Sequence, residues 1–215
     1  MNIRHITVAL IAVLAYDILM QFIMGLTPSI YAFMDSSHLI TVLSFVSGII
    51  TLLFFLFFFW EERASNAVAA LVSLLVLTGI ISFFLQLTQL SVYFPFEYGL
   101  SIVYTSALIK MVLLFLVMRA FKASVDASES KLHRSAGILM ILFALGALGR
   151  AYDLWEMYTY VYGLGQWPTY SYWHIVMFFL FIITHGVMIW FLLDYLAYKN
   201  ARRDNNASQA VGTVA

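Results

Sequence analysis

SHLITVLSFVSGIITLLFFLFFFW, residues 37–60, contains no acidic or basic side chain except one histidine. A helix needs about 20 consecutive apolar residues to cross the hydrocarbon core of a bilayer. Lipid cannot satisfy free backbone amides, so an uninterrupted apolar stretch of this length must cross as an α-helix. The stretch therefore predicts a membrane-spanning helix, and the rest of the chain repeats its pattern.

Other apolar stretches of similar length lie before and after residues 37–60 in the sequence. The complete set is 6–25, 37–60, 66–88, 98–120, 136–158 and 169–197. Each stretch is long enough to span a bilayer. We therefore expect an all-α fold, a polytopic membrane bundle of about six transmembrane helices. It should form one domain over residues 1–198, followed by a disordered cytoplasmic tail at 199–215.

The composition agrees with this fold and excludes several classes of function. Hydrophobic residues make up 63% of the 215 residues and charged residues 10%, against about 25% charged residues in soluble domains. The net charge is zero and the five His are scattered, which argues against a nucleic-acid surface. Cysteine is absent, so thiolate ligands and cysteine nucleophiles are excluded. No phosphate-binding loop or hydrolytic motif is found, and whether the chain is an enzyme stays open.

Positively charged residues indicate the orientation in the membrane. They occur at the start, in the second and fourth connections and in the tail, as Arg4, Arg63, Arg119, Lys122, Lys131, Arg134, Lys199, Arg202 and Arg203. The first, third and fifth connections carry no Lys or Arg. By the positive-inside rule, both termini are expected in the cytoplasm. The expected location is the cytoplasmic (inner) membrane of a bacterium or archaeon.

Two separate parts of the chain share a motif, which predicts an internal repeat. AYDI at 15–18 in the first predicted helix matches AYDL at 151–154 in the fifth. In each copy a histidine opens the next helix 21 residues after the Asp, at His38 and at His174. Two helical hairpins thus match without a gap.

The repeat divides the chain into related helical hairpins. The matching copies are 1–64 and 134–198, and 65–122 is a weaker third copy in which Gln89 and Lys110 are also 21 residues apart. Many membrane proteins built from repeats bind their substrate at the repeat interface, near the middle of the bilayer. The repeat therefore predicts a shared central site.

Charged residues within the predicted helices need partners. Burying a charge at a helix centre costs about 2.5 to 3.5 kcal/mol on the insertion scale. Arg150 and Asp153 are three residues apart on one helix face, which predicts an ion pair. Lys110 lies about 18 Å inside the membrane, too deep to reach water, and Asp17 is its nearest counter-charge in depth. We expect Lys110 and Asp17 to interact, either as a static pair or as a site that changes its protonation or its bound ligand during turnover.

Histidines at matched positions suggest a second kind of site. His38 and His174, with Asp17 and Asp153, could form a transition-metal site for zinc, copper or iron, or the two imidazoles could clamp haem b. His185 follows His174 by 11 residues, about three turns, so both share a helix face that could relay protons. These histidines can equally be ordinary interfacial or packing residues.

Aromatic and amide side chains near these groups are candidate ligand contacts. Tyr16 and Tyr152 belong to the repeated motif, and Gln89 takes the place of the Asp in the middle hairpin. Residues 154–173 read LWEMYTYVYGLGQWPTYSYW, a dense aromatic stretch at the predicted outer surface. It is either an interfacial belt or the mouth of a site for quinone, a haem edge or an aromatic ligand.

Three hypotheses about function follow from these features. The first is transport of a proton, ion or small solute through the buried Asp/Lys/His site. The second is a membrane redox subunit that holds haem b or a metal and exchanges electrons with quinone. The third is a structural subunit whose polar residues pair with other chains of a membrane complex or with a second copy.

Overall fold

The computed structural model describes residues 3–26, 39–62, 66–91, 96–125, 129–159 and 172–212. Over these residues the chain is helical and has no strand, which confirms the all-α prediction. Each helix covers one predicted apolar stretch. The helices are α1 (Ile3–Leu26), α3 (Leu39–Glu62), α4 (Asn66–Ser91), α5 (Phe96–Ser124), α6 (Ser130–Met157) and α7 (Tyr172–Gly212).

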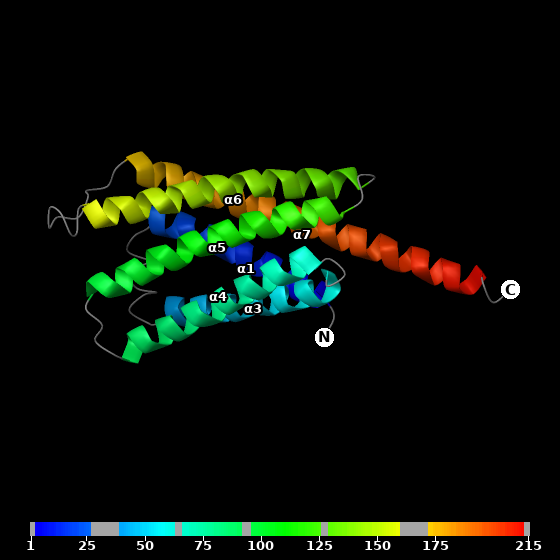
Figure 1. Ribbon diagram of the computed structural model, residues 1–215, viewed down its shortest axis with the longest axis horizontal. Helices are drawn as coiled ribbons and strands as arrows, with labels where there is room; N and C mark the ends of the chain where they lie inside the picture. Colours follow the sequence, from blue (N-terminus) through cyan, green and yellow to red (C-terminus); the bar gives the residue numbers. More distant parts are fainter. Residues whose placement is uncertain are drawn as a thin grey trace.

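The helices run side by side along the length of the molecule (Figure 1), and their contacts form a closed ring in chain order. Each of α3 to α7 packs against the next, and α1 closes the ring by packing between α7 and α3. Neighbours are antiparallel, as expected of helices joined by short connections. α1, α4 and α6 begin at the end of the bundle where α3 and α5 finish. This end carries Arg4, Lys122, Lys131 and Lys199 and is termed the basic end.

Aromatic side chains fill the centre of the ring near the basic end. Phe54 and Phe58 of α3, Phe121 of α5, and Phe191 and Tyr195 of α7 are each at most 3% exposed. Phe58 contacts both Phe121 and Tyr195 with ring centroids 5.4 Å apart. α3, α5 and α7 are not neighbours in the ring, so their side chains can meet only in its centre. These five rings, termed the aromatic plug, close the ring at this end.

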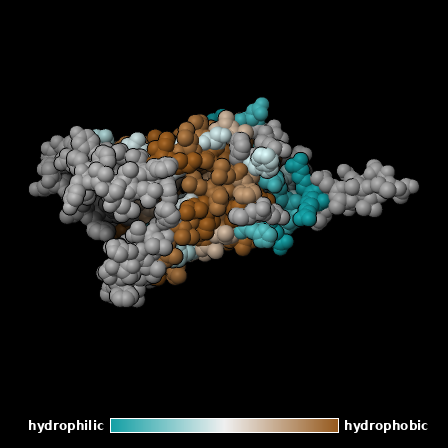
Figure 2. Space-filling model, turned by 90° about the horizontal axis from the view of Figure 1, so that it is seen from below, coloured by the Kyte–Doolittle hydropathy of each residue, from teal (hydrophilic) through white to brown (hydrophobic). Residues whose placement is uncertain are grey.

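Apolar side chains also cover the outside of the bundle. The face drawn in Figure 2 shows a band of hydrophobic residues across its middle and hydrophilic residues gathered toward the basic end. Leu148, Trp60 and Leu19 are 68%, 62% and 56% exposed. A continuous apolar surface of this kind would associate in water and suits contact with lipid. Three helices are long and apolar enough over their described residues to cross a bilayer, at Ile3–Ile23, Ser130–Met157 and Ile175–Arg203.

The segment that follows residue 199, expected to be a disordered tail, is helical in the structure as far as Gly212. α7 continues as a helix to Gly212 and extends beyond the rest of the bundle (Figure 1). Extending an existing helix needs no new nucleation, and residues 187–211 contain neither Pro nor Gly. The continuation places Lys199 opposite the end of α3.

A histidine closes the turn between α5 and α6. His133 Nε2 lies 3.1 Å from the carbonyl oxygen of Val125, directly after α5, and the Val125 N–H donates to the carbonyl of Phe121. The last carbonyl groups of a helix have no intrahelical donor. The imidazole N–H satisfies one such group, so His133 has a structural role at the basic end.

Replacing His133 with Ala is expected to lower the free energy of unfolding by about 0.5 to 1.5 kcal/mol, because one net hydrogen bond is lost. Thermal unfolding of the detergent-solubilised protein measures the change. His5→Ala is the matched control, because His5 is exposed at the same end. Equal midpoints for the two variants would contradict the assignment.

Candidate functional site: a polar cavity between three helices

A small cavity lies between α5, α6 and α7. Its polar side chains are Arg150 from α6 and Thr184 and His185 from α7, and Met111 of α5 lies among its apolar walls. The cavity volume is about 40 Å³. One buried water needs about 10 to 15 Å³ of such space, so the cavity has room for about three waters.

Two glycines of α6 shape this region. Gly146 lines the cavity, and a Cβ atom there would lie 3.3 Å from Sδ of Met111. At Gly149 a Cβ atom would lie 2.5 Å from Sδ of Met177 and 3.5 Å from the ring of Trp173. Gly149 therefore lets α7 approach α6 closely. Gly146 leaves open space that a side chain would occupy.

Arg150 belongs to a hydrogen-bonded cluster beside the cavity. Its Nη1 donates to Oδ2 of Asp153 at 3.0 Å, and Nε1 of Trp173 donates to Oδ1 of the same carboxylate at 2.8 Å. The side chains of Arg150 and Asp153 are 32% and 14% exposed. Nε of Arg150 is buried and has no hydrogen-bond partner among the residues that the structure describes. The predicted ion pair is thus formed.

His185 and Thr184 present hydrogen-bond acceptors to the cavity. His185 Nδ1 lies 2.9 Å from the Phe181 carbonyl, which can only accept, so Nδ1 is the donor. In the neutral ring, Nε2 then carries a lone pair. The Thr184 hydroxyl donates to the Leu180 carbonyl at 2.7 Å, which leaves its oxygen free to accept. The Phe181 ring lies 3.8 Å from the imidazole and holds it in place.

The cavity lies further from the basic end than the aromatic plug. A narrow apolar void inside the ring is lined by Leu114, Phe143, Met188 and Phe191, among others. Three residues of the polar cavity lie three positions along their helices from residues that line the void. Met111 precedes Leu114, Gly146 follows Phe143, and His185 precedes Met188. Each pair therefore shares a helix face, and the cavity residue lies about one turn further from the basic end. The polar cavity thus lies about one helical turn beyond this void, on the side of the ring formed by α5, α6 and α7.

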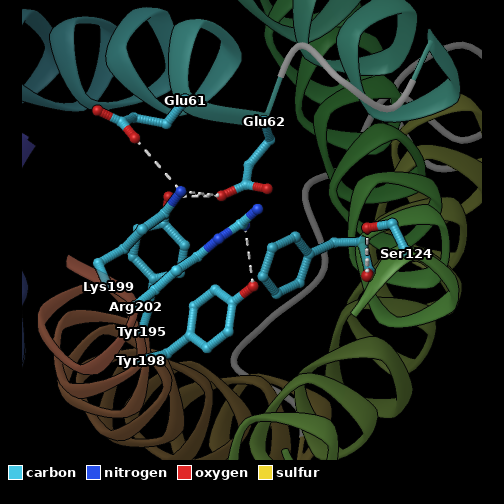
Figure 3. A network of polar contacts seen from close by, with 8 residues as sticks. Glu61, Glu62, Ser124, Tyr195, Tyr198, Lys199 and Arg202 are labelled. Atoms are coloured by element: carbon cyan, nitrogen blue, oxygen red, sulfur yellow. Dashed lines mark hydrogen bonds and ion pairs between the residues drawn. The ribbon is translucent and has the colours of Figure 1, made fainter. Parts of the chain in front are cut away.

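A polar network lies on the other side of the plug, at the basic end (Figure 3). The hydroxyl of Tyr195, which is 0% exposed, donates to Oε1 of Glu62 at 2.9 Å. Lys199 Nζ lies 2.7 Å from the same oxygen and 3.3 Å from Oε2 of Glu61. Arg202 donates to the hydroxyl of Tyr198 at 3.3 Å. The network joins α3 to α7.

An open groove lies outside this network, where α1, α3 and α7 meet. Its volume is about 610 Å³, and it is lined by Arg4, Glu61, Glu62, Lys199 and Arg203 among others. With increasing distance from the groove, the network therefore comes first, then the plug and then the polar cavity.

The predicted interaction between Lys110 and Asp17 is not formed in the part of the chain that the structure describes. Both residues are half-buried, Lys110 in the middle of α5 and Asp17 in α1. The reason is the order of the ring: α1 packs against α3 and α7, whereas α5 packs against α4 and α6. Similar depth in the membrane did not make these residues neighbours.

The predicted metal or haem site receives no support from the described residues. His38 lies outside them, and α7 includes His174 without a described side chain. Within the described ranges, no group of three or more His, Asp or Glu side chains could hold a metal ion. Both oxygens of Asp153 already accept hydrogen bonds. The expected role of Asp153 as a metal ligand is therefore not supported.

The predicted ligand contacts do not gather around the cavity. Tyr152 is 39% exposed, and its ring packs 4.7 Å from that of Trp173. Tyr16 is half-buried in α1, on the far side of α7 from α6. Gln89 belongs to α4, and its side chain lies outside the described set. Of the predicted polar residues, Arg150, Asp153 and His185 are the ones brought together.

Several residues of the site were not anticipated. Thr184 precedes His185 without any motif that singles it out, and Trp173 looked like part of the aromatic belt. The charge of Lys199 served only to mark topology, and Glu62 was not singled out. Tyr195 bonds to a carboxylate 133 residues away in sequence. Such a long-range contact leaves no local signal.

Comparison with known proteins adds no assignment. No protein family, curated protein or solved structure matches the chain. Function is therefore inferred from the cavity, the plug and the network.

Proposed function

We propose that the chain crosses the membrane six times, with both termini in the cytoplasm, and moves a proton or small polar solute along the axis of its helix ring. α3, α4 and α5 cover the remaining apolar stretches and would supply the other three spans. The basic end would face the cytoplasm under the positive-inside rule. The membrane would be the cytoplasmic membrane of a bacterium or archaeon.

The observation that carries this proposal is a polar cavity between α5, α6 and α7 whose walls include Arg150, Thr184 and His185. A purely structural Arg150–Asp153 pair would have no need of an adjacent cavity with His and Thr in its walls. Ionisable groups that face the interior of a membrane bundle typically mark a pathway for ions or solutes.

In this arrangement the path is closed at the basic end. The aromatic plug blocks the axis, and the Tyr195–Glu62–Lys199 network links α7 to α3 beside it. Opening would require α7 to move away from α3, which breaks the network and separates the rings of Phe58 and Tyr195. Movement of helices around a fixed site is the usual mechanism of alternating access.

Lys199→Met is expected to raise flux by about fivefold, because a partly exposed ion pair contributes about 1 kcal/mol to the closed arrangement. Flux is measured in liposomes at equal protein content. Lys131→Met is the matched control, since Lys131 is exposed at the same end and makes no ion pair among the described residues. An unchanged rate in Lys199→Met would argue against a gate at the network.

Reconstitution tests the function directly. Purified protein in liposomes is assayed with an internal pH dye, a chloride indicator and osmotic shrinkage in urea. Passage of at least one probe above protein-free liposomes is expected, and no passage of any probe would sink the proposal. An absorption spectrum with elemental analysis tests the redox alternative, for which a Soret band lost in His174→Ala would be the signature. Purification at fixed stoichiometry with other chains, or as a homo-oligomer, would favour a structural subunit.

A further inference from the structure

The hydrogen-bonding groups of the cavity define the kind of guest that fits it. Building on the proposed function, we infer that the cavity binds a small uncharged molecule that both accepts and donates hydrogen bonds, such as a simple amide, and that it disfavours ions. The inference uses the donors, the acceptors, the charge and the size of the cavity.

One wall provides a donor. Arg150 lines the cavity, and one of the five N–H groups of its guanidinium, on Nη1, donates to Asp153. Arginine has N–H donors only and no acceptor. The guest must therefore present an acceptor, such as a carbonyl or hydroxyl oxygen, to the guanidinium.

The wall formed by α7 provides acceptors. His185 Nδ1 is occupied by the Phe181 carbonyl, so the neutral ring offers the lone pair of Nε2. The Thr184 hydroxyl donates its hydrogen to the Leu180 carbonyl, and its oxygen can accept a hydrogen bond. The guest must therefore also carry an N–H or O–H group. These lone pairs would repel an anion, and the positively charged guanidinium would repel a cation.

The cavity carries no net charge to balance an ion. The Arg150 guanidinium is compensated by Asp153, and both carboxylate oxygens are occupied, by Arg150 and by Trp173. The remaining walls, including Met111, Met177 and Phe181, are apolar. Transfer of an uncompensated ion into such surroundings is costly, whereas a hydrogen-bonded neutral molecule avoids that cost.

The cavity also limits the size of the guest. Its volume of about 40 Å³ corresponds to about three water molecules. Urea is close to this upper limit, and glycerol exceeds it. Water would occupy the cavity when no guest is bound, because polar cavities of this size are normally hydrated.

Osmotic shrinkage of proteoliposomes tests the inference with urea, glycerol and chloride as probes. Urea is expected to enter faster through wild-type protein than through protein-free liposomes, with glycerol and chloride close to the protein-free rate. Thr184→Val keeps the shape of the side chain and removes the hydroxyl, so urea flux should fall by about fivefold for one lost hydrogen bond. Thr78→Val is the matched control, because the Thr78 hydroxyl also donates only to its own helix, at the Leu74 carbonyl, and Thr78 does not line the cavity.

The possible results separate this inference from the proposed function. Chloride or proton flux without urea flux would overturn the neutral guest and leave transport standing. Urea flux that is equal in Thr184→Val and in Thr78→Val would remove the cavity from the pathway. If no probe crosses, the proposed function itself fails. Detergent melting curves of each variant confirm that the protein is folded, and His185→Phe, which keeps an aromatic ring and removes Nε2, provides a second variant with the same expected loss.

Discussion

Valine in place of Gly146 is expected to reduce flux through reconstituted protein to the level of protein-free liposomes. Gly146 lines the cavity, and a Cβ atom there already comes within 3.3 Å of Met111 Sδ. The two methyl groups of valine would take up most of the space of the cavity, which holds about three waters. The flexible Met111 side chain can move aside, so the helix bundle should survive the change. Flux is measured at equal amounts of incorporated protein.

Gly186→Val is the matched control for this substitution. Gly186 follows His185 on α7, but it is exposed, and a Cβ atom there meets nothing within 4 Å. The control adds the same side chain at similar depth and leaves the cavity open. Its flux should stay at the wild-type level. Wild-type flux in Gly146→Val, with normal folding, would show that solutes do not pass through the cavity.

Asp153→Leu is expected to lower the free energy of unfolding by about 3 to 5 kcal/mol, the range for removal of one partner of a buried pair. The change leaves the Arg150 guanidinium without its counter-charge and Trp173 Nε1 without its acceptor. The effect should lie near the lower end, because the Arg150 side chain is 32% exposed and can turn toward the membrane surface. Unfolding of the detergent-solubilised protein provides the measurement.

A double-mutant cycle separates the ion pair from packing. Arg150→Met combined with Asp153→Leu removes both charges, so the double variant should be more stable than Asp153→Leu alone. Trp173→Phe removes only the indole donor and should cost about 1 kcal/mol. If Asp153→Leu unfolds like the wild type, the cluster of Arg150, Asp153 and Trp173 does not hold α6 to α7.

The helices were largely predictable because their signal is local. The stretch 37–60 has no charged side chain apart from its histidine, and α3 covers Leu39–Glu62. The Arg150–Asp153 pair was predictable for the same reason, since residues three apart on a helix share a face. Hydropathy misplaced the start of α6, which begins at Ser130 rather than near residue 136, because polar residues can continue a helix beyond the apolar stretch. The internal repeat stays a prediction.

The order of the ring explains most of the errors. Lys110 and Asp17 were paired by depth alone, but their helices belong to different sides of the ring. Arg150 and His185 were expected to belong to one polar site, and they line the same cavity because α6 and α7 are neighbours. The tail was expected to be disordered because it is polar, yet it continues a helix that had already formed.

Apolar length and helical periodicity belong to contiguous residues, so the primary structure alone was enough to specify helices that suit a bilayer and the pairs within a single helix. The site depends instead on which helices are neighbours and how each is rotated. Tyr195 reaches Glu62 across 133 residues, and the aromatic plug forms only because α3, α5 and α7 converge. Contacts of this kind come from side-chain packing in the folded bundle, where depth and rotation are set by all the helices together.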